Sequence, residues 1–438
     1  MLRKENMILV QDGEKISENF VKDKRLSRLT SRQGESCYIS FVGIVLNKQD
    51  VIISVPKHFY NREEFGSNSL LTKGQIVADV KDLLSIIVKG ESSITGKKED
   101  NLPIDSYLIV QEFYKKYGLY TRKIKSEFSG YFGRINWKKT VQKSQKVVQN
   151  NGILFLPFQL EKKIDISTFI SECMEFVLGN TYNHFQQYLD FLTPYDHKIK
   201  NPIFNDFKRC KTELQRIREK LFKDLEKKLI DALIEYFDWL SAYDTPVMIV
   251  TKNFELYWEA LIAIYLNEHF SSVSSSGMIN FEKNLKEKFA FKDKKLKVED
   301  SQLLAIQERN GFSIEFDHIR FDESEILLFD SKYVKDDKIK GLNYKQAFYY
   351  YYLLSQFPGK RIVNGLILPT SSVYSHAVHI DRETKIIYDP RTSQFTTLDK
   401  NFIDGLKIIE HKVNLKKVIE VGSKFPKELK INLLKNKN

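Results

Sequence analysis

The sequence of 438 residues contains no apolar run long enough to span a bilayer, and its first fifteen residues lack the apolar core of a secretion signal. Cysteine is scarce, because only Cys37, Cys173 and Cys210 occur, widely spaced and odd in number. This usage fits reduced thiols and argues against a zinc site. Internal repeats and low-complexity segments are also absent. Together these absences predict a globular cytoplasmic protein with no membrane association.

The sequence also lacks a phosphate-binding loop. Its nearest approach is GESSITGKK, residues 90–98, which has one residue too many between its glycines. Lysine stands where a serine or threonine should hold the metal. We therefore interpret this segment as a linker and expect that the chain is not itself an NTPase.

A positive charge is the main compositional feature that is present. The formal net charge is +12, and the sequence pI is about 9.1. A basic surface attracts phosphate backbones, which favours a nucleic-acid partner. An AT-rich genome would also raise the lysine content, so charge alone leaves both explanations open. The high aromatic content of 13% indicates core packing first.

The first hundred residues predict a small β-rich domain, which we place at residues 1–104. Residues 37–57 have the pattern of a hairpin, with β-branched apolar strands on either side of a turn at 47–50. Polar segments containing Gly and Ser follow at 62–74 and 92–103 and predict loops.

Residues 105–245 are expected to form a mainly helical middle region. Apolar residues recur at roughly helical spacing in 105–117 and 165–192, and residues 205–243 form a long amphipathic run rich in Lys and Glu. One stripe of this run predicts a buried helix face, made by Leu221, Leu225, Leu229, Leu233 and Phe237.

A short motif of the middle region, GRINWKKTV, places Trp137 beside Arg134, Lys138 and Lys139. Basic residues around an aromatic ring can hold a nucleic-acid strand by charge and stacking. The alternative, which we favour, is a buried tryptophan that anchors the region while its lysines are solvated.

From residue 246 helical and strand patterns alternate, which predicts a C-terminal α/β domain at 246–438 and makes the whole chain a multidomain α+β protein. Its most informative stretch is SIEFDHIRFDESEILLFDSKY, residues 313–333, in which an acidic turn separates two apolar strands. The second strand ends with Asp330 and Lys332. Side chains two residues apart share a face of a strand, so both charges point into the same space.

Charges at the end of a buried strand require an explanation, because unpaired charges are costly to bury. Mg²⁺ takes carboxylate oxygens and is used with substrate phosphates, so Asp330 and the nearby Asp317 are candidate ligands. Lys332 would hold the attacking water and offset the charge that develops on a scissile phosphate. The alternative is a salt bridge between Lys332 and one aspartate at a sheet edge.

Two expected helices add candidate residues. In residues 253–266 Glu259 falls on an apolar surface, either as a third metal ligand or as a boundary residue that reaches solvent. Glu255, one turn earlier, is the rival third acid. The helix at 343–357 carries Lys345 and Gln346 on its first turn, near the strand ends, where contacts with phosphate or water are expected.

The order of a strand with Asp317, a strand with Asp330 and Lys332, and a helix with Gln346 resembles the PD-(D/E)xK nuclease superfamily. Phe316 stands where that motif has proline. Six segments between residues 38 and 369 resemble, in the expected order, the McrC-like nuclease subunits of McrBC systems and the related LlaJI restriction endonucleases. They are SFVGIVLNKQDVIISVPK, GRINWKKTV, FELYWEALI, ILLFDSKY, YKQAFYYYYLL and NGLILP.

The resemblance implies a Mg²⁺-dependent endonuclease subunit of a bacterial restriction system that acts in antiviral defence on double-stranded DNA. It implies a C-terminal PD-(D/E)xK domain with a mixed central sheet. The implied catalytic residues are Asp317, Asp330, Lys332, Glu259 and Gln346, with Asp317, Asp330 and Glu259 holding the metal.

The resemblance further implies a hetero-oligomer with a McrB-like partner NTPase of the AAA+ type. The N-terminal region would dock onto this partner, and the partner would supply most of the sequence recognition. Two alternatives remain: a catalytically weak adaptor that stimulates the NTPase, and a stand-alone nuclease.

Overall fold

The computed structural model shows an α+β chain that forms two compact units, one comprising Met1–Asn101 with Thr245–Asn438 and the other Leu102–Asp244. The predicted α+β class is confirmed, while the division into three domains stays a prediction. None of the described helices combines the length and apolarity that crossing a bilayer requires. The structure describes residues 6–47, 50–61, 71–94, 102–149, 152–167, 169–196, 201–242, 247–282, 291–297, 313–334, 344–382, 386–389, 394–397 and 405–425.

The N-terminal part of the first unit is built on a four-stranded sheet of order β1-β6-β5-β12. The predicted hairpin is confirmed, because β5 and β6 pair antiparallel. The strands that fall between β1 and β5 in the sequence form a smaller three-stranded sheet of order β2-β4-β3. The elements are β1 (Asn6–Gln11), β2 (Lys15–Ile16), α1 (Glu18–Asp23), η1 (Ser27–Leu29), β3 (Thr30–Gln33), β4 (Ser36–Ile39), β5 (Val42–Leu46), β6 (Asp50–Val55) and β12 (Val247–Thr251).

Strand β12 reaches this sheet only after the whole second unit has been completed. It pairs antiparallel with β5, and Val250 lies opposite Gly43. The φ of Gly43 is +136°, and a Cβ built there would lie 2.1 Å from the carbonyl oxygen of Ile249. Only glycine permits this backbone approach. The glycine of the segment SFVGIVL therefore allows a distant strand to complete the sheet.

A long helix, α3 (Lys73–Ile94), follows the N-terminal sheet and was not predicted. The loops expected at 62–74 and 92–103 are confirmed at 71–72 and 102–103 but wrong at 73–74 and 92–94, which are helical; residues 62–70 and 95–101 lie outside the described residues. The linker interpretation of 90–98 is likewise wrong for 90–94. The cause is a run of apolar residues at helical spacing that the flanking polar segments obscured: Val80, Leu83, Leu84 and Ile87 are all buried.

The second unit contains α4 (Ile104–Tyr117), α6 (Phe169–Phe185), η2 (Pro202–Asn205), α7 (Phe207–Arg218) and α8 (Asp224–Ala242). The helix expected at 105–117 is confirmed. The one expected at 165–192 begins only at Phe169, and the run at 205–243 is two helices. Of the predicted apolar stripe Leu229, Leu233 and Phe237 are buried, whereas Leu225 is exposed and Leu221 precedes α8.

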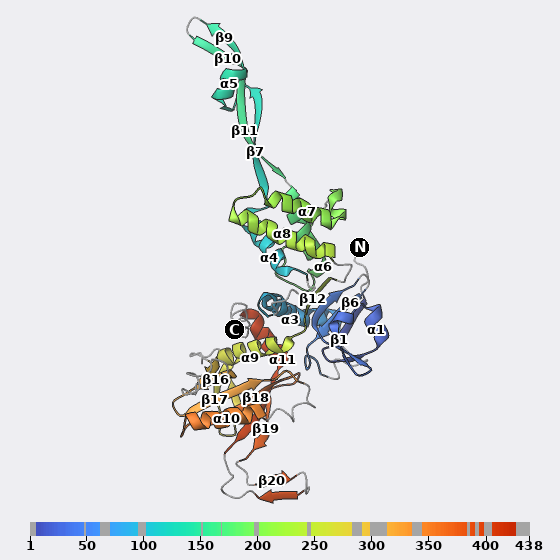
Figure 1. The fold of residues 1–438 in the computed structure, drawn as a ribbon, viewed down its shortest axis with the longest axis vertical. Helices are drawn as coiled ribbons and strands as arrows, with labels where there is room; N and C mark the ends of the chain where they lie inside the picture. The colour runs from blue at the N-terminus through green and yellow to red at the C-terminus, as the bar shows by residue number, and fades with distance from the viewer. Residues whose placement is uncertain are drawn as a thin grey trace, which may run out of the picture. The chain divides into compact units, whose positions relative to one another are not determined.

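The second unit also carries an extended two-stranded ribbon of β7 (Thr121–Gly130) and β11 (Phe158–Ser167), which pair antiparallel along their whole length. We call residues 121–167 the arm. Figure 1 shows α5 and the hairpin β9–β10 at the end of the ribbon away from α7 and α8. The elements at this end are β8 (Arg134–Ile135), α5 (Trp137–Lys143), β9 (Gln145–Gln149) and β10 (Gly152–Leu156).

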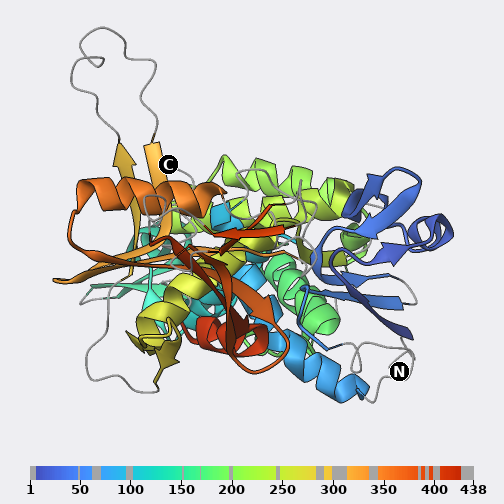
Figure 2. The same ribbon diagram turned by 90° about the horizontal axis from the view of Figure 1, so that it is seen from below.

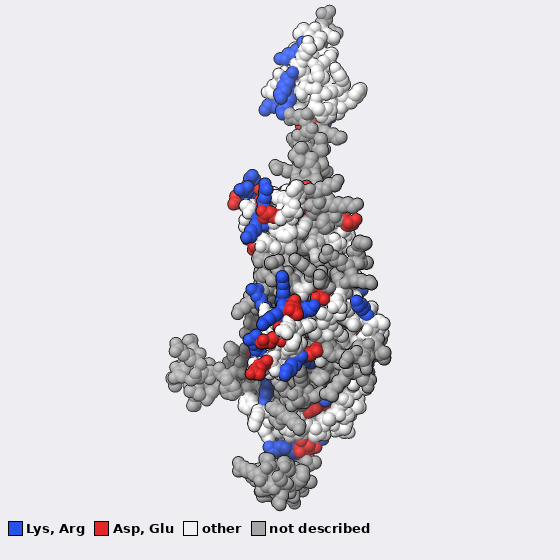
Figure 3. Space-filling view, turned by 90° about the vertical axis from the view of Figure 1, so that its right-hand side faces the viewer, with Lys and Arg blue, Asp and Glu red and all other residues white. Residues whose placement is uncertain are grey.

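The end of the arm exposes apolar side chains rather than burying them. Trp137 is 59% exposed and Phe132 is 92% exposed, so the favoured interpretation of a buried tryptophan is wrong. The Trp137 ring packs edge-on against Phe158 at the start of β11. Basic side chains run along one edge of the same end (Figure 3). Further exposed apolar residues there are Tyr131, Val141, Val148, Ile153 and Leu154.

The C-terminal part of the first unit has a mixed six-stranded sheet of order β15-β16-β17-β18-β22-β19. Strands β17, β18 and β22 are parallel, and β16 and β19 run antiparallel to their neighbours. Figure 2 shows α10 on one side of this sheet and α9 on the other. The elements are α9 (Phe254–His269), β13 (Phe270–Val273), β14 (Ile279–Phe281), β15 (Lys292–Lys297), β16 (Ser313–Phe321), β17 (Glu325–Ser331), α10 (Tyr344–Gln356), β18 (Arg361–Thr370), β19 (Ser375–Asp381), β20 (Ile386–Asp389), β21 (Gln394–Thr397), β22 (Lys407–Asn414) and α11 (Leu415–Lys424).

Alternate residues of β17 form the apolar face of the strand on which helix α10 packs. Ile326 and Leu328 pack against Tyr349 and Leu353 of α10, as expected for an apolar helix face laid on a strand of period two. Asp330 continues the same face and therefore points toward the first turn of α10. The sheet thus directs the charged end of β17 to the region where Lys345 and Gln346 begin the helix.

On the sheet, His411 of β22 is fully buried and remains neutral. Burial, and then the neighbouring His376, lower the pKa of His411 to about 3. Its Nδ1 hydrogen-bonds the Tyr374 hydroxyl at 2.9 Å, and its Nε2 has no hydrogen-bond partner among the described residues. Because the unfolded histidine titrates near its ordinary value of 6.5, protonation favours unfolding below that pH.

We therefore expect the free energy of unfolding to fall as the pH decreases from 6.5 toward 3, by up to about 1.4 kcal/mol per pH unit. Urea unfolding at pH 7, 6 and 5 measures this slope. The variant His411→Gln should show a smaller slope. If the free energy of unfolding had the same pH dependence in both proteins, the lowered pKa of His411 would be contradicted.

Candidate active site

The two candidate aspartates come together because β16 and β17 pair antiparallel. His318 lies opposite Phe329 in the register, which brings Asp317 beside Asp330. The Oδ2 of Asp317 accepts a hydrogen bond of 3.2 Å from the backbone N–H of Ser331. His318 points to the other face, where it contacts the hydroxyl of Ser331. The pairing thus presents both carboxylates on one face of the sheet.

Two lysines reach these carboxylates from different elements. Lys332, directly after β17, contacts the Oδ2 of Asp330, and its Nζ lies 3.9 Å from the Oδ2 of Asp317. Lys345, from the first turn of α10, places its Nζ 3.0 Å from the Oδ1 of Asp330 and 3.6 Å from the Oδ1 of Asp317. The structure therefore brings together Asp317, Asp330, Lys332 and a second lysine.

Burial and neighbouring charges shift the pKa values of the two aspartates in opposite directions. Burial, followed by the charges of Asp330 and Glu259, raises the pKa of Asp317 to about 8 against the opposing effect of the lysines. Burial also acts to raise the pKa of Asp330, but Lys332 and Lys345 together outweigh it and hold that pKa below its ordinary value. Paired carboxylates whose pKa values diverge are typical of functional sites.

Glu259 and Glu255 of α9 have different surroundings. Half-buried Glu259 contributes to the raised pKa of Asp317, which places its charge near the aspartates. Glu255 acts instead on the pKa of Tyr333. Of the two rival acids, Glu259 is therefore the one whose charge acts on the carboxylate pair.

Gln346, next to Lys345 on α10, is buried rather than open to solvent. Neither atom of its side-chain amide has a hydrogen-bond partner among the described residues, although its backbone oxygen accepts from the side chain of Asn364 at 3.1 Å. Buried amides are rarely left unsatisfied, so a water or a bound group is expected to complete this environment.

The donor set fits Mg²⁺. Among the described residues no group of three or more histidine, cysteine or acidic side chains has the arrangement of a metal-binding cluster. Two carboxylates do converge, however, with the charge of Glu259 nearby. Mg²⁺ is usually held by one or two carboxylates together with waters and substrate phosphates. Asp317 and Asp330 therefore suffice for such a site.

Tyr333, the residue after Lys332, connects the end of β17 to the N-terminal part of the chain, a contact that the sequence did not indicate. The hydroxyl of Tyr333 donates to the Oδ2 of Asp12 at 3.0 Å and accepts from the backbone N–H of Lys57 at 2.7 Å. The Lys57 ammonium lies 4.4 Å from the centre of the Tyr333 ring and 3.3 Å from Asp12. Lys332 is thus anchored through its neighbour.

We expect Tyr333→Phe to lower the free energy of unfolding by about 1–2 kcal/mol, because a largely buried carboxylate and a backbone N–H each lose a partner. Urea unfolding measures the change. Tyr344→Phe, on the exposed start of α10, is the matched control and should leave stability unchanged. Equal stability of the Tyr333 variant and the unmodified protein would refute this role of the hydroxyl.

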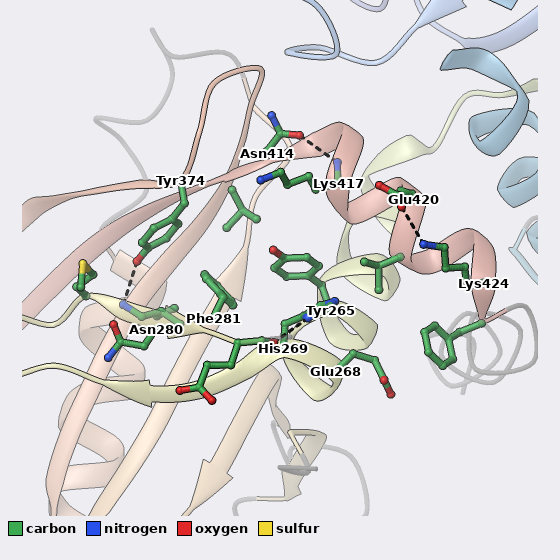
Figure 4. A pocket seen from close by; sticks show the side chains of 16 residues that line it. Tyr265, Glu268, His269, Asn280, Phe281, Tyr374, Asn414, Lys417, Glu420 and Lys424 are labelled. Carbon is green, nitrogen blue, oxygen red and sulfur yellow. Dashed lines mark hydrogen bonds and ion pairs between the residues drawn. The ribbon is translucent and has the colours of Figure 1, made fainter. Parts of the chain in front are cut away.

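A cavity of about 1050 Å³ lies elsewhere in the C-terminal part, between α9, the β13–β14 hairpin and α11 (Figure 4). Its walls include Tyr265, Phe281, Tyr374 and Lys417. None of the candidate carboxylates lines it. The aspartate pair is the candidate site because two buried carboxylates and two lysines converge there, whereas the ion pair of Glu420 and Lys424 that lines the cavity is largely exposed.

Comparisons with known proteins agree with the sequence-based resemblance. The profile described as LlaJI restriction endonuclease matches residues 41–381, well over half of the chain. No curated protein matches.

Two solved structures from Thermococcus gammatolerans are distantly similar to this chain. One is the half-complex from the tetradecameric assembly of McrB AAA+ hexamers with bound McrC (12% identity, 99% of this chain and 100% of that chain, TM-score 0.37). The other is the McrBC complex determined by cryo-EM (10% identity, 56% of this chain and 83% of that chain, TM-score 0.25). On the family match, this chain belongs to the LlaJI restriction endonuclease family.

Proposed function

We propose that this chain is the nuclease subunit of a bacterial restriction system and hydrolyses phosphodiester bonds of double-stranded DNA in a Mg²⁺-dependent, PD-(D/E)xK-type site. The observation that carries the proposal is the convergence of Asp317, Asp330 and Lys332 at the end of a buried parallel strand. The basic composition of the chain is consistent with a DNA substrate.

Each residue has a definite task in this proposal. Asp317 and Asp330, with Glu259, would hold Mg²⁺, which when bound supplies Lewis-acid stabilisation of negative charge on the phosphate. The ammonium of Lys332, beside Asp330, orients the attacking water and offsets charge on the phosphate in the transition state. Gln346, with an amide free of partners among the described residues, holds a water or phosphate oxygen.

We also propose that activity depends on an AAA+ partner NTPase, as the resemblance implies. The N-terminal region is the expected docking site, and the end of the arm provides a second surface for it. Contiguous exposed apolar residues on a soluble protein usually mark an interface. Aliphatic side chains such as Val148 and Ile153 lie exposed among the aromatic rings of this surface and, because they cannot stack on bases, they favour a protein partner.

Plasmid cleavage tests the proposed function. The protein is incubated with supercoiled plasmid in Mg²⁺ or EDTA, with and without the proposed AAA+ partner NTPase. We expect Mg²⁺-dependent cutting that requires the partner and is lost in Asp330→Ala. Asp322→Ala, at the turn between β16 and β17 and paired with Arg320, is the matched control.

Other outcomes would separate the alternatives. Cutting that needs no partner but is lost in Asp330→Ala would indicate a stand-alone nuclease. Stimulation of the partner's NTP hydrolysis with no cutting under any condition would contradict the nuclease assignment and indicate an adaptor.

A further inference from the structure

The second lysine of the site, Lys345, has a position that the roles proposed above do not explain. Its Nζ lies between the two carboxylates, 3.0 Å from the Oδ1 of Asp330 and 3.6 Å from the Oδ1 of Asp317. Lys332 approaches the opposite oxygens, the Oδ2 atoms, of the same two residues. Each lysine therefore bridges the pair on its own side.

Charge balance distinguishes the lysines. Asp317, Asp330 and Glu259 can carry three negative charges, and the two ammonium groups already offset two of them. A bound divalent cation together with both lysines would leave an excess of positive charge within a few ångströms. Like charges so close in a partly buried site repel strongly. One ammonium must therefore move away when a divalent cation binds.

Lys345 is the lysine that can move. Its side chain is 45% exposed, compared with 26% for Lys332. It projects from the first turn of a helix, whereas Lys332 is fixed by a backbone hydrogen bond from its N–H to the carbonyl of Ile367 and by the anchored Tyr333 that follows it. The ammonium of Lys345 already lies 5.3 Å from the centre of the Tyr349 ring, so a shift away from the carboxylates would keep it next to an aromatic face.

Resting on the proposed function, we propose that Lys345 is a built-in counter-cation that occupies the space between the two aspartates in the metal-free protein and competes with the divalent metal. It is a positioning residue for the carboxylates. Lys345 holds the two carboxylates close together when no metal is bound, and it weakens metal binding. The metal therefore binds only when another interaction compensates for the displacement of the Lys345 ammonium. A DNA phosphate near the site would supply that offset by receiving the displaced ammonium.

The test is metal binding rather than cleavage. Isothermal titration with Mg²⁺, and separately with Ca²⁺, is performed on the full-length protein without DNA. We expect Lys345→Met to bind the metal more tightly than the unmodified protein, by roughly tenfold, which corresponds to about 1.4 kcal/mol. Lys345→Arg retains the charge and should retain the weak affinity.

Two further variants make the result specific. Lys360→Met, beyond the other end of α10 where its ammonium contacts the Asp322 carbonyl, removes a lysine without touching the aspartates and should not change the affinity. Asp330→Asn should abolish binding. A thermal shift gives a second readout: Lys345→Met should melt lower in EDTA and gain more from Mg²⁺ than the unmodified protein.

The outcomes separate this inference from the proposed function. Unchanged or weaker metal affinity in Lys345→Met, with binding still lost in Asp330→Asn, would overturn the role of Lys345 and leave the metal site intact. Failure of all these proteins to bind metal, or binding that survives Asp330→Asn, would overturn the metal site and this inference with it.

Discussion

Asp317→Asn and Asp330→Asn are each expected to reduce Mg²⁺-dependent DNA cleavage by at least about a thousandfold and yet to change the stability of the metal-free protein in opposite directions. The loss of activity follows from the several kcal/mol of charge stabilisation that a metal contributes to phosphoryl chemistry. The stability effects follow from the opposite pKa shifts of the two carboxyls.

The two carboxyls affect stability with opposite signs. The pKa of Asp317 is raised in the folded protein, so its ionisation costs stability progressively as the pH rises from about 4 toward 8. The neutral amide of the Asp317→Asn variant avoids that cost. The pKa of Asp330 is lowered, so its charge stabilises the fold at all pH values above the ordinary aspartate range. An amide there leaves Lys332 and Lys345 facing each other.

Thermal unfolding in EDTA at about pH 8.5 measures these effects. We expect the midpoint to rise by several degrees in the Asp317 variant and to fall by several degrees in the Asp330 variant, since about 1 kcal/mol corresponds to a few degrees in a chain of this size. At pH 5 the gain of the Asp317 variant should shrink. If the unfolding midpoint moved in the same direction in both variants, the opposite pKa shifts of Asp317 and Asp330 would be contradicted.

Phe132→Ala is expected to weaken binding of the partner NTPase by at least about thirtyfold, the loss typical of a buried aromatic anchor at an interface. The side chain is 92% exposed, so its removal should leave the stability of the isolated protein unchanged. Partner-dependent plasmid cutting should fall in parallel, whereas metal binding at the aspartate site should not change. Binding of the partner measured by interferometry gives the affinity directly.

Phe222→Ala provides the matched control. Phe222 is 86% exposed in the same compact unit but lies between α7 and α8, outside the arm. Its removal should leave partner binding unaffected. Equal losses for the two variants would mean that general surface hydrophobicity, rather than the end of the arm, governs assembly. Loss of DNA binding without loss of partner binding in Phe132→Ala would indicate a nucleic-acid surface instead.

The sequence by itself determined the features that depend on neighbours in the chain. The β5–β6 hairpin, helix α4 and the succession β16, β17 and α10 follow from local apolar period and turn residues. The spacing of Asp330 and Lys332 was sufficient to put both charges at one end of a buried strand. Helix α3 was also readable from its apolar spacing, although the polar segments on either side of it misled the prediction.

Tertiary structure decided what depends on residues far apart in the chain. The exposure of Trp137 could not be read from its sequence, because an aromatic residue among lysines fits a core anchor and a surface equally well. The preference for Glu259 over Glu255 depends on how α9 packs on the sheet, since the charge of Glu259 acts on Asp317 whereas that of Glu255 acts on Tyr333. Likewise the Tyr333–Asp12 contact and the pairing of β12 with β5 join segments separated by hundreds of residues.

The position of Lys345 shows the physical reason most clearly. Sequence placed this residue on the first turn of a helix near the strand ends, but a long flexible side chain can reach several partners. Only the packing of α10 on Ile326 and Leu328 fixes the helix so that the ammonium lies between the two carboxylates. Local pattern specifies which charges are present, and long-range packing specifies which of them meet.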